Sequence, residues 1–183
     1  MQRAVFLDRD GTLIVEKNYL SRPEDVEPFA GAGGALKKLA DAGYALVMVT
    51  NQSGIGRGYF TMADAERVNA RVCGDFAREG ARFEKIYIAP EAPDQPSRGR
   101  KPSPQFLFDA REEFALDLAE SFMVGDKLID LQCGWNAGVK KSILVRTGYG
   151  RETERENAGE ISRAVVVDGL AEMADWILRS GSK

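Results

Sequence analysis

Short apolar runs alternate along this chain with segments of helical periodicity, and this alternation limits the possible folds more than any other feature. The runs are rich in β-branched residues and nearly continuous, which is typical of strands covered on both faces of a parallel sheet. They lie at residues 4–7, 44–49, 85–88, 122–124, 142–145 and 164–167. Strand–helix alternation of this kind predicts an α/β fold, a doubly wound, mainly parallel Rossmann-like sheet flanked by helices.

Helix signals lie between these runs. Thr61 and Asp64 have the spacing of a capping box, in which each side chain bonds to the other residue's backbone N–H. Ser103 is a suitable N-cap, with Pro104 at the first helical position. Further helices are expected at residues 32–42 and 170–179, and a surface loop at residues 148–162.

The length of 183 residues predicts a single domain, residues 1–183, with a core of ordinary size. No apolar run approaches the ~20 residues of a membrane span, and the first residues lack the apolar stretch of a signal peptide. The net charge of −3 gives no overall attraction to nucleic acid or to an anionic membrane. We therefore expect a cytoplasmic monomer that acts on a small molecule, with neither nucleic acid nor membrane as a partner.

The sequence contains no histidine and only two cysteines. This composition excludes Ser-His-Asp and Cys-His catalysis, imidazole metal ligands and a four-cysteine zinc site. Any acid–base chemistry must therefore come from carboxylate, Lys, Tyr or Cys side chains.

Polar residues follow the predicted strands where the chain leaves the sheet. In a doubly wound sheet, ligands bind outside the carboxyl ends of the strands, so chemistry is expected at these positions. Four segments supply carboxylate, hydroxyl, amide and basic groups: Asp8-Arg9-Asp10-Gly11-Thr12, Thr50-Asn51-Gln52-Ser53, Arg100-Lys101-Pro102, and Gly125-Asp126-Lys127 with Asp130. The topology predicts that these segments meet at one edge of the sheet.

The residue types in these segments favour phosphoryl transfer. Asp8 and Asp10 would share one face of an extended strand and repel each other unless a cation or a shared proton intervenes. Asp126 could complete a hard oxygen site suited to Mg²⁺. Asp8 could then attack phosphorus while Thr50 and Lys101 stabilise the phosphoryl oxygens. Asp10 could protonate the leaving oxygen and later deprotonate water.

The four segments, in this order, resemble the haloacid dehalogenase superfamily of phosphatases over nearly the whole chain. The resemblance implies that Asp8 is the nucleophile, that Asp10 is the general acid/base, and that Thr50 and Lys101 stabilise the phosphoryl group. It also implies that Mg²⁺ is bound by Asp8, the backbone carbonyl of Asp10, and Asp126. The short spacing between the first strand and the first helix leaves no room for a large cap domain.

Within the superfamily, residues 50–61 are similar to the heptose bisphosphate phosphatases, which share a subfamily with the histidinol-phosphate phosphatases. This similarity implies removal of the 7-phosphate of D-glycero-D-manno-heptose 1,7-bisphosphate, a step in lipopolysaccharide-precursor synthesis. Arg100 and Lys127 would contact the phosphate groups of the substrate. The residues implied to line the sugar site are Glu16, Lys17, Asn18, Tyr19, Asn51, Gln52 and Ser53.

The chain departs from its subfamily in one loop. Many members carry a zinc-binding loop with one His and three Cys just before the Arg-Lys-Pro segment. Here residues 89–100 contain neither Cys nor His, so no zinc is predicted. Five of the seven prolines lie at residues 89–104, where they can stiffen the loop in place of a metal.

The sequence is compatible with other functions. A histidinol-phosphate phosphatase or a broad sugar-phosphate phosphatase would use the same chemistry. A receiver-like phosphorylated switch would also place aspartates on a doubly wound sheet, although Asp10 in an acid/base role argues for turnover. Asp130 either hydrogen-bonds within the site or lies on a solvated helix face, and Arg57 is either structural or phosphate-binding.

Overall fold

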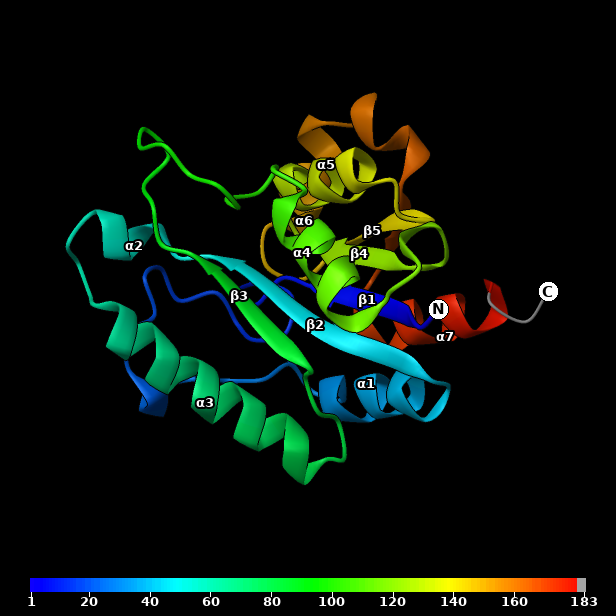
Figure 1. The fold of residues 1–183 in the computed structure, drawn as a ribbon, viewed down its shortest axis with the longest axis horizontal. Helices are drawn as coiled ribbons and strands as arrows, with labels where there is room; N and C mark the ends of the chain where they lie inside the picture. The colour runs from blue at the N-terminus through cyan, green and yellow to red at the C-terminus, as the bar shows by residue number, and fades with distance from the viewer. Residues whose placement is uncertain (181–183) are drawn as a thin grey trace.

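The computed structural model describes residues 1–180, and within them lies one six-stranded sheet (Figure 1). Neighbouring strands are all parallel, in the order β3-β2-β1-β4-β5-β6. The strands are β1 (Arg3–Leu7), β2 (Tyr44–Asn51), β3 (Lys85–Ala89), β4 (Phe122–Gly125), β5 (Lys141–Val145) and β6 (Val165–Val167). The prediction of a doubly wound parallel sheet is confirmed.

Helices cover both faces of this sheet (Figure 1). On one face, α1 (Ala32–Asp41), α3 (Met62–Arg78) and α7 (Leu170–Ser180) bury their apolar sides against the strands. On the other face lie α4 (Gln105–Phe114) and α5 (Leu128–Ala137). Because the central strands β1, β2 and β4 are covered on both sides, nearly all of their successive side chains are buried, which explains their continuous apolar runs in the sequence.

Shorter helices occupy the connections, and two of them correct a prediction. They are α2 (Ser53–Gly56), α6 (Gly150–Glu156), η1 (Pro23–Asp25), η2 (Leu118–Glu120) and η3 (Glu160–Arg163). The prediction of a surface loop at residues 148–162 was wrong, because α6 and η3 lie there. Thr153 Oγ1 donates a hydrogen bond to the carbonyl of Asp126 at 2.8 Å, and Ile161 is buried in an apolar cluster. Each of these two helices is anchored by a single side chain in a polar stretch, so the sequence shows no apolar periodicity that would predict a helix.

The predicted helix starts differ in outcome. The capping box at α3 is confirmed, since Thr61 N donates to Asp64 Oδ2 at 2.8 Å and Asp64 N donates to Thr61 Oγ1 at 3.2 Å. α4 begins one residue later than expected, with Pro104 as its N-cap. Ser103 Oγ still accepts a hydrogen bond from Gln105 N at 3.3 Å. Its side chain therefore caps the first backbone N–H of α4, although Ser103 lies one residue before the N-cap.

The strand order positions the site. β1 and β4 are neighbours, yet the chain continues from β1 towards one end of the sheet and from β4 towards the other. The connecting segments therefore part above the ends of these two strands and leave a crevice, where such folds bind ligands. Asp8 and Asp126 directly follow β1 and β4, and Asp8 N donates to the carbonyl of Val124 at 3.0 Å.

No separate cap domain is present within residues 1–180, because the chain between β1 and α1 holds only the single turn of η1. In the same residues, no helix combines the length and the apolar character that crossing a membrane would require. The crevice above β1 and β4 is therefore bordered by the loops that follow the strands and by the first residues of α2 and α5.

The capping box of α3 makes a measurable contribution to stability. Thr61→Ala removes the hydroxyl that accepts from Asp64 N, so we expect the free energy of unfolding to fall by about 1 kcal/mol in urea denaturation. Thr61→Ser keeps the hydroxyl and is the matched control, with most of the stability retained. Equal losses in the two variants would show that the hydroxyl does not cap the helix.

Candidate active site

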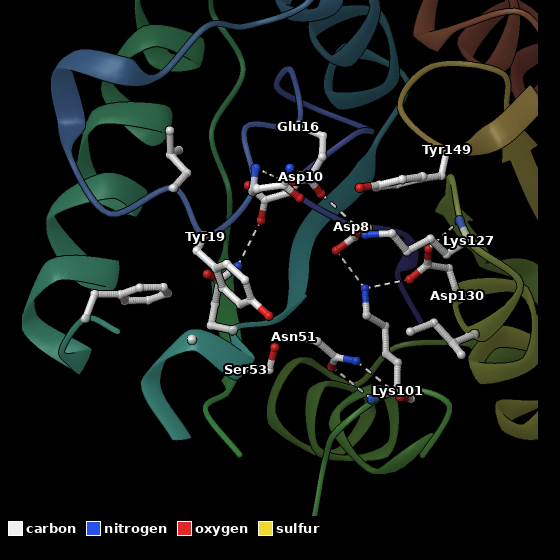
Figure 2. A pocket seen from close by; sticks show the side chains of 16 residues that line it. Asp8, Asp10, Glu16, Tyr19, Asn51, Ser53, Lys101, Lys127, Asp130 and Tyr149 are labelled. Atoms are coloured by element: carbon white, nitrogen blue, oxygen red, sulfur yellow. Dashed lines mark hydrogen bonds and ion pairs between the residues drawn. The ribbon is translucent and has the colours of Figure 1, made fainter. Parts of the chain in front are cut away.

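A cavity of about 270 Å³ opens at the carboxyl ends of the central strands (Figure 2). Most of the predicted site residues line it, although they come from segments far apart in the chain. The lining consists of Asp8, Asp10, Glu16, Asn18, Tyr19, Leu20, Asn51, Gln52, Ser53, Gly54, Phe60, Lys101, Lys127, Ile129, Asp130 and Tyr149. Two further predicted residues, Thr50 and Asp126, are buried directly behind it.

Lys101 carries a buried ammonium group between two carboxylates, as Figure 2 shows. Its Nζ lies 2.7 Å from Asp8 Oδ1 and 2.6 Å from Asp130 Oδ1, and it donates to the carbonyl of Val49 at 2.8 Å. Burial disfavours the charged form, but Asp130 and Asp8 outweigh this effect and raise the pKa of Lys101 above its usual value. Asp130 thus lies inside the site and not on a solvated helix face.

Asp126 is fully buried, and only one of its two carboxylate oxygens is hydrogen-bonded within residues 1–180. Its Oδ2 accepts a hydrogen bond from the backbone N–H of Tyr149 at 2.8 Å, whereas its Oδ1 has no hydrogen-bond partner in residues 1–180. Burial, followed by the charges of Asp8 and Asp130, raises the pKa of Asp126. The three aspartates each offer an oxygen within 4.8 Å of the others. An orphaned buried carboxylate oxygen in such a cluster fits the oxygen ligands that Mg²⁺ prefers.

Two glycines leave room for this carboxylate. Gly11 has a φ of +81°, and a Cβ at this position would overlap the Asp126 carboxylate. Gly148 has a φ of +52°, and its Cβ would overlap both the same carboxylate and the backbone of Gly11. Thr147 Oγ1 fastens the two segments by donating to the carbonyl of Gly11 at 2.7 Å. The segment after β5 therefore packs against the Asp126 carboxylate and encloses the aspartate cluster, which its sequence did not indicate.

The Asp10 carboxylate is held from two sides. Gln52 Nε2 donates to Asp10 Oδ2 at 2.9 Å and to Thr50 Oγ1 at 2.7 Å. Arg9 pairs with the same carboxylate from the protein interior, at 3.0 and 3.1 Å. Gln52, expected to contact substrate, thus also connects the two predicted catalytic residues Asp10 and Thr50.

The proline-rich loop between β3 and α4 is braced by its own hydrogen bonds. Ser97 Oγ donates to Glu91 Oε2 at 2.7 Å, and Arg100 Nη1 donates to the Glu91 carbonyl at 3.1 Å. At the end of the loop, the Asn51 side chain accepts from Lys101 N at 3.0 Å and donates to the Lys101 carbonyl at 3.1 Å. Asn51 therefore positions Lys101, besides lining the cavity.

The segment after the first motif forms one wall of the cavity. Glu16 Oε1 accepts a hydrogen bond from Asn18 N at 2.9 Å, and Glu16 Oε2 lies 3.4 Å from Lys127 Nζ. Asn18 and Tyr19 have φ values of 44° and 55°, a left-handed conformation that is strained for side chains other than glycine. The half-exposed Tyr19 ring packs edge-on against Tyr59, with 4.8 Å between ring centroids.

Two predicted substrate-binding residues, Lys17 and Arg100, do not line the cavity in the described part of the chain. Lys17 Nζ forms an ion pair with Glu27 at 2.9 Å, and Glu27 does not line the cavity either. Arg100 belongs to the braced loop, where burial and then the nearby charge of Arg57 lower its pKa. Arg57 and Arg100 therefore lie close enough for their charges to interact.

Tyr149 lines the cavity and was missed in the sequence. Its ring lies under Lys127, with Nζ 4.7 Å from the ring centroid, and its N–H donates to Asp126. Residues 148–162 were expected to form a surface loop, so Tyr149 was not assigned to the site. The one signal for it in the sequence is an aromatic side chain among polar neighbours. Figure 2 shows Tyr149 and Lys127 together on the side of the cavity opposite Tyr19.

Comparisons with known proteins agree with this architecture. Residues 99–173 match the HAD-hydrolase-like family model. A D-glycero-beta-D-manno-heptose-1,7-bisphosphate 7-phosphatase of Haemophilus ducreyi is 39% identical, with 96% of this chain and 98% of the relative covered. The protein of that name in Escherichia coli K12 is also 39% identical, with 97% and 88% covered.

A solved structure shows the same relationship. The crystal structure of D,D-heptose 1,7-bisphosphate phosphatase from B. bronchiseptica, complexed with magnesium and phosphate, is 31% identical. It superimposes with a TM-score of 0.90 over 97% of this chain and 99% of the other. The chain therefore belongs to the haloacid dehalogenase-like hydrolases, in the same family as these heptose bisphosphate phosphatases.

Proposed function

We propose that this protein is a Mg²⁺-dependent phosphomonoesterase that removes the 7-phosphate of D-glycero-D-manno-heptose 1,7-bisphosphate. The observation that carries the proposal is the buried ammonium of Lys101, 2.7 Å from Asp8 and 2.6 Å from Asp130, beside an Asp126 oxygen without a partner in residues 1–180. The names of the relatives support the substrate, and the magnesium and phosphate of the solved neighbour support the chemistry.

Asp8 is the proposed nucleophile. Lys101 holds its Oδ1 and keeps a positive charge beside the incoming phosphate. A bond forms between an Asp8 oxygen and phosphorus while the bond from phosphorus to the sugar oxygen breaks, leaving the electron pair on that oxygen. Asp10 gives its proton to the sugar oxygen and then takes a proton from the water that hydrolyses the aspartyl-phosphate. Lys101 and Thr50 stabilise the phosphoryl oxygens.

Asp8, Asp126 and the backbone carbonyl of Asp10 are the residues proposed to hold Mg²⁺. The ion would supply positive charge that offsets the carboxylates and the phosphate oxygens. The paired state of Asp130, which lies against Lys101, leaves Asp126 Oδ1 as the oxygen most in need of a cation. No zinc is proposed, since the braced loop offers no thiolate or imidazole ligand.

The walls of the cavity are proposed to grip the sugar. Glu16, Asn18, Tyr19 and Lys127 line the cavity, with Tyr19 and Lys127 on opposite sides (Figure 2) and Glu16 within 3.4 Å of Lys127. Burial opposes the charge of Lys127, but the surrounding carboxylates, Asp126 first, outweigh it and raise the pKa of this lysine. Lys127 therefore stays cationic and suits an anionic group of the substrate. The same proposal takes residues 1–183 as a single domain that acts as a cytoplasmic monomer on a small molecule. Arg100 and Lys17 remain proposed substrate contacts, on the family resemblance alone.

Loss of the nucleophile should abolish turnover. Asp8→Asn keeps the size of the side chain and removes its charge, so we expect kcat for heptose 1,7-bisphosphate to fall by about 10³-fold or more in a phosphate-release assay. Asp41→Asn, at an exposed aspartate paired with Lys37, is the matched control and should leave kcat unchanged. Activity retained in Asp8→Asn would refute an aspartyl-phosphate mechanism.

The substrate is tested by competition between its two closest candidates. We expect kcat/KM for heptose 1,7-bisphosphate to exceed that for histidinol phosphate by about 100-fold or more, because specificity depends on this ratio. Equal or higher efficiency on histidinol phosphate would reassign the substrate. A stable phosphoprotein without continued phosphate release would instead indicate a receiver-like switch.

Metal binding should appear in the pH dependence of stability. In metal-free protein the pKa of Asp126 is raised from 3.8 to about 8, so the folded state holds a proton that the unfolded chain releases. Stability is therefore lost as the pH rises through this window, and Mg²⁺ should restore it most strongly at the upper end. We expect the Tm in EDTA to fall between about pH 5 and pH 8 and added Mg²⁺ to flatten that slope.

Asp126→Asn is the control for this experiment, because it keeps the shape of the side chain and removes its titration. Its Tm should depend less on pH in EDTA and should respond little to Mg²⁺. A wild-type Tm that is insensitive to Mg²⁺ at pH 8 would argue against the proposed metal site.

A further inference from the structure

Arg9 is a fully buried arginine to which the mechanism above assigns no role. Its Nε donates to Asp10 Oδ2 at 3.0 Å and its Nη2 donates to Asp10 Oδ1 at 3.1 Å, a two-point grip on one carboxylate. Its Nη1 donates to Asn69 Oδ1 at 2.8 Å. Three of its donors thus connect Asp10, the proposed acid/base, with helix α3.

Asn69 is an unusual residue for its position. It is 3% exposed and lies on the side of α3 that packs on the sheet, close to the fully buried Val68 and Val72. Its Nδ2 has no hydrogen-bond partner in residues 1–180. An unsatisfied buried amide group costs free energy, and so does a buried guanidinium, so packing alone would favour apolar side chains at both positions.

We propose that Arg9 and Asn69 are positioning residues for proton transfer. Asn69 holds the guanidinium of Arg9 from α3, and Arg9 in turn fixes the carboxylate of Asp10 at the cavity wall. This inference rests on the proposed function, in which Asp10 gives a proton to the leaving sugar oxygen. It extends the site to a helix that contributes no residue to the cavity lining in the described chain.

The same hydrogen bonds select one oxygen of Asp10. A carboxylate offers about four acceptor positions, two on each oxygen. Arg9 Nε and Gln52 Nε2 both donate to Oδ2, whereas Arg9 Nη2 alone donates to Oδ1. One position on Oδ1 stays open within residues 1–180, so Oδ1 is the oxygen that carries the proton towards the substrate.

The test compares leaving groups in three variants. Asn69→Leu removes the acceptor of Arg9 at similar volume. Asn69→Asp keeps an acceptor oxygen and replaces only Nδ2, so it is the conservative rescue. Val72→Ala, on the same side of α3, reproduces a loss of packing without touching Arg9. The substrates are heptose 1,7-bisphosphate, whose alkoxide needs a proton to leave, and p-nitrophenyl phosphate, whose phenolate does not.

We expect Asn69→Leu to lower kcat/KM for heptose 1,7-bisphosphate by about 30- to 100-fold, because a general acid out of place loses most of its effect. The loss with p-nitrophenyl phosphate should stay within about threefold, since Asp10 donates no proton in that step. Asn69→Asp should recover to within about threefold of wild type on both substrates. Val72→Ala should match wild type on both, with only its Tm lowered.

Equal losses on the two substrates, or no loss on either, would overturn the positioning role. A crystal structure of Asn69→Leu supplies an independent measurement, because the Asp10 carboxylate should leave its wild-type place and an unmoved carboxylate would also overturn the inference. Failure of the proposed function looks different, since wild-type protein would then release no phosphate from heptose 1,7-bisphosphate while Asp10 still moved in Asn69→Leu.

Discussion

Repulsion among buried carboxylates is the constraint on which the rest of the site depends. The ends of parallel strands bring Asp8 and Asp126 together, and the following helix adds Asp130 to the same cluster. Lys101 neutralises part of this charge through its contacts with Asp8 and Asp130, and the orphaned Asp126 oxygen calls for a further cation. The cluster is therefore an unfavourable arrangement that a bound cation would relieve.

The surrounding structure keeps this arrangement from relaxing. Asn51 ties the backbone of Lys101 to the end of β2 through two hydrogen bonds, so the ammonium cannot withdraw with its loop. Glycine at 11 and 148 lets two backbone segments close over the Asp126 carboxylate. Preorganised charges of this kind stabilise a transition state without a reorganisation cost at the moment of reaction. In the proposed mechanism, charge stabilisation and proton transfer use separate contacts, because Arg9 and Gln52 hold Asp10 while Lys101 holds Asp8.

The sequence was sufficient for the architecture because burial on both faces leaves a direct mark. Each strand appears as a continuous apolar run, and parallel strands place their carboxyl ends together, so Asp8 and Lys101 could be assigned to one site although they are 93 residues apart. Short helices held by single side chains leave no such mark, which is why residues 148–162 were taken for a loop and Tyr149 was missed.

The sequence by itself determined the sheet, the edge at which chemistry occurs and the residue types available there, since these follow from local apolar patterning and strand order. Only the tertiary structure decided which polar side chains pair with one another. Asn51 hydrogen-bonds to the backbone of Lys101, Lys17 forms an ion pair with Glu27, and Asn69 accepts a hydrogen bond from Arg9, 60 positions away in the chain. Such pairings depend on ångström-scale distances between residues remote in sequence, and no local pattern carries that information.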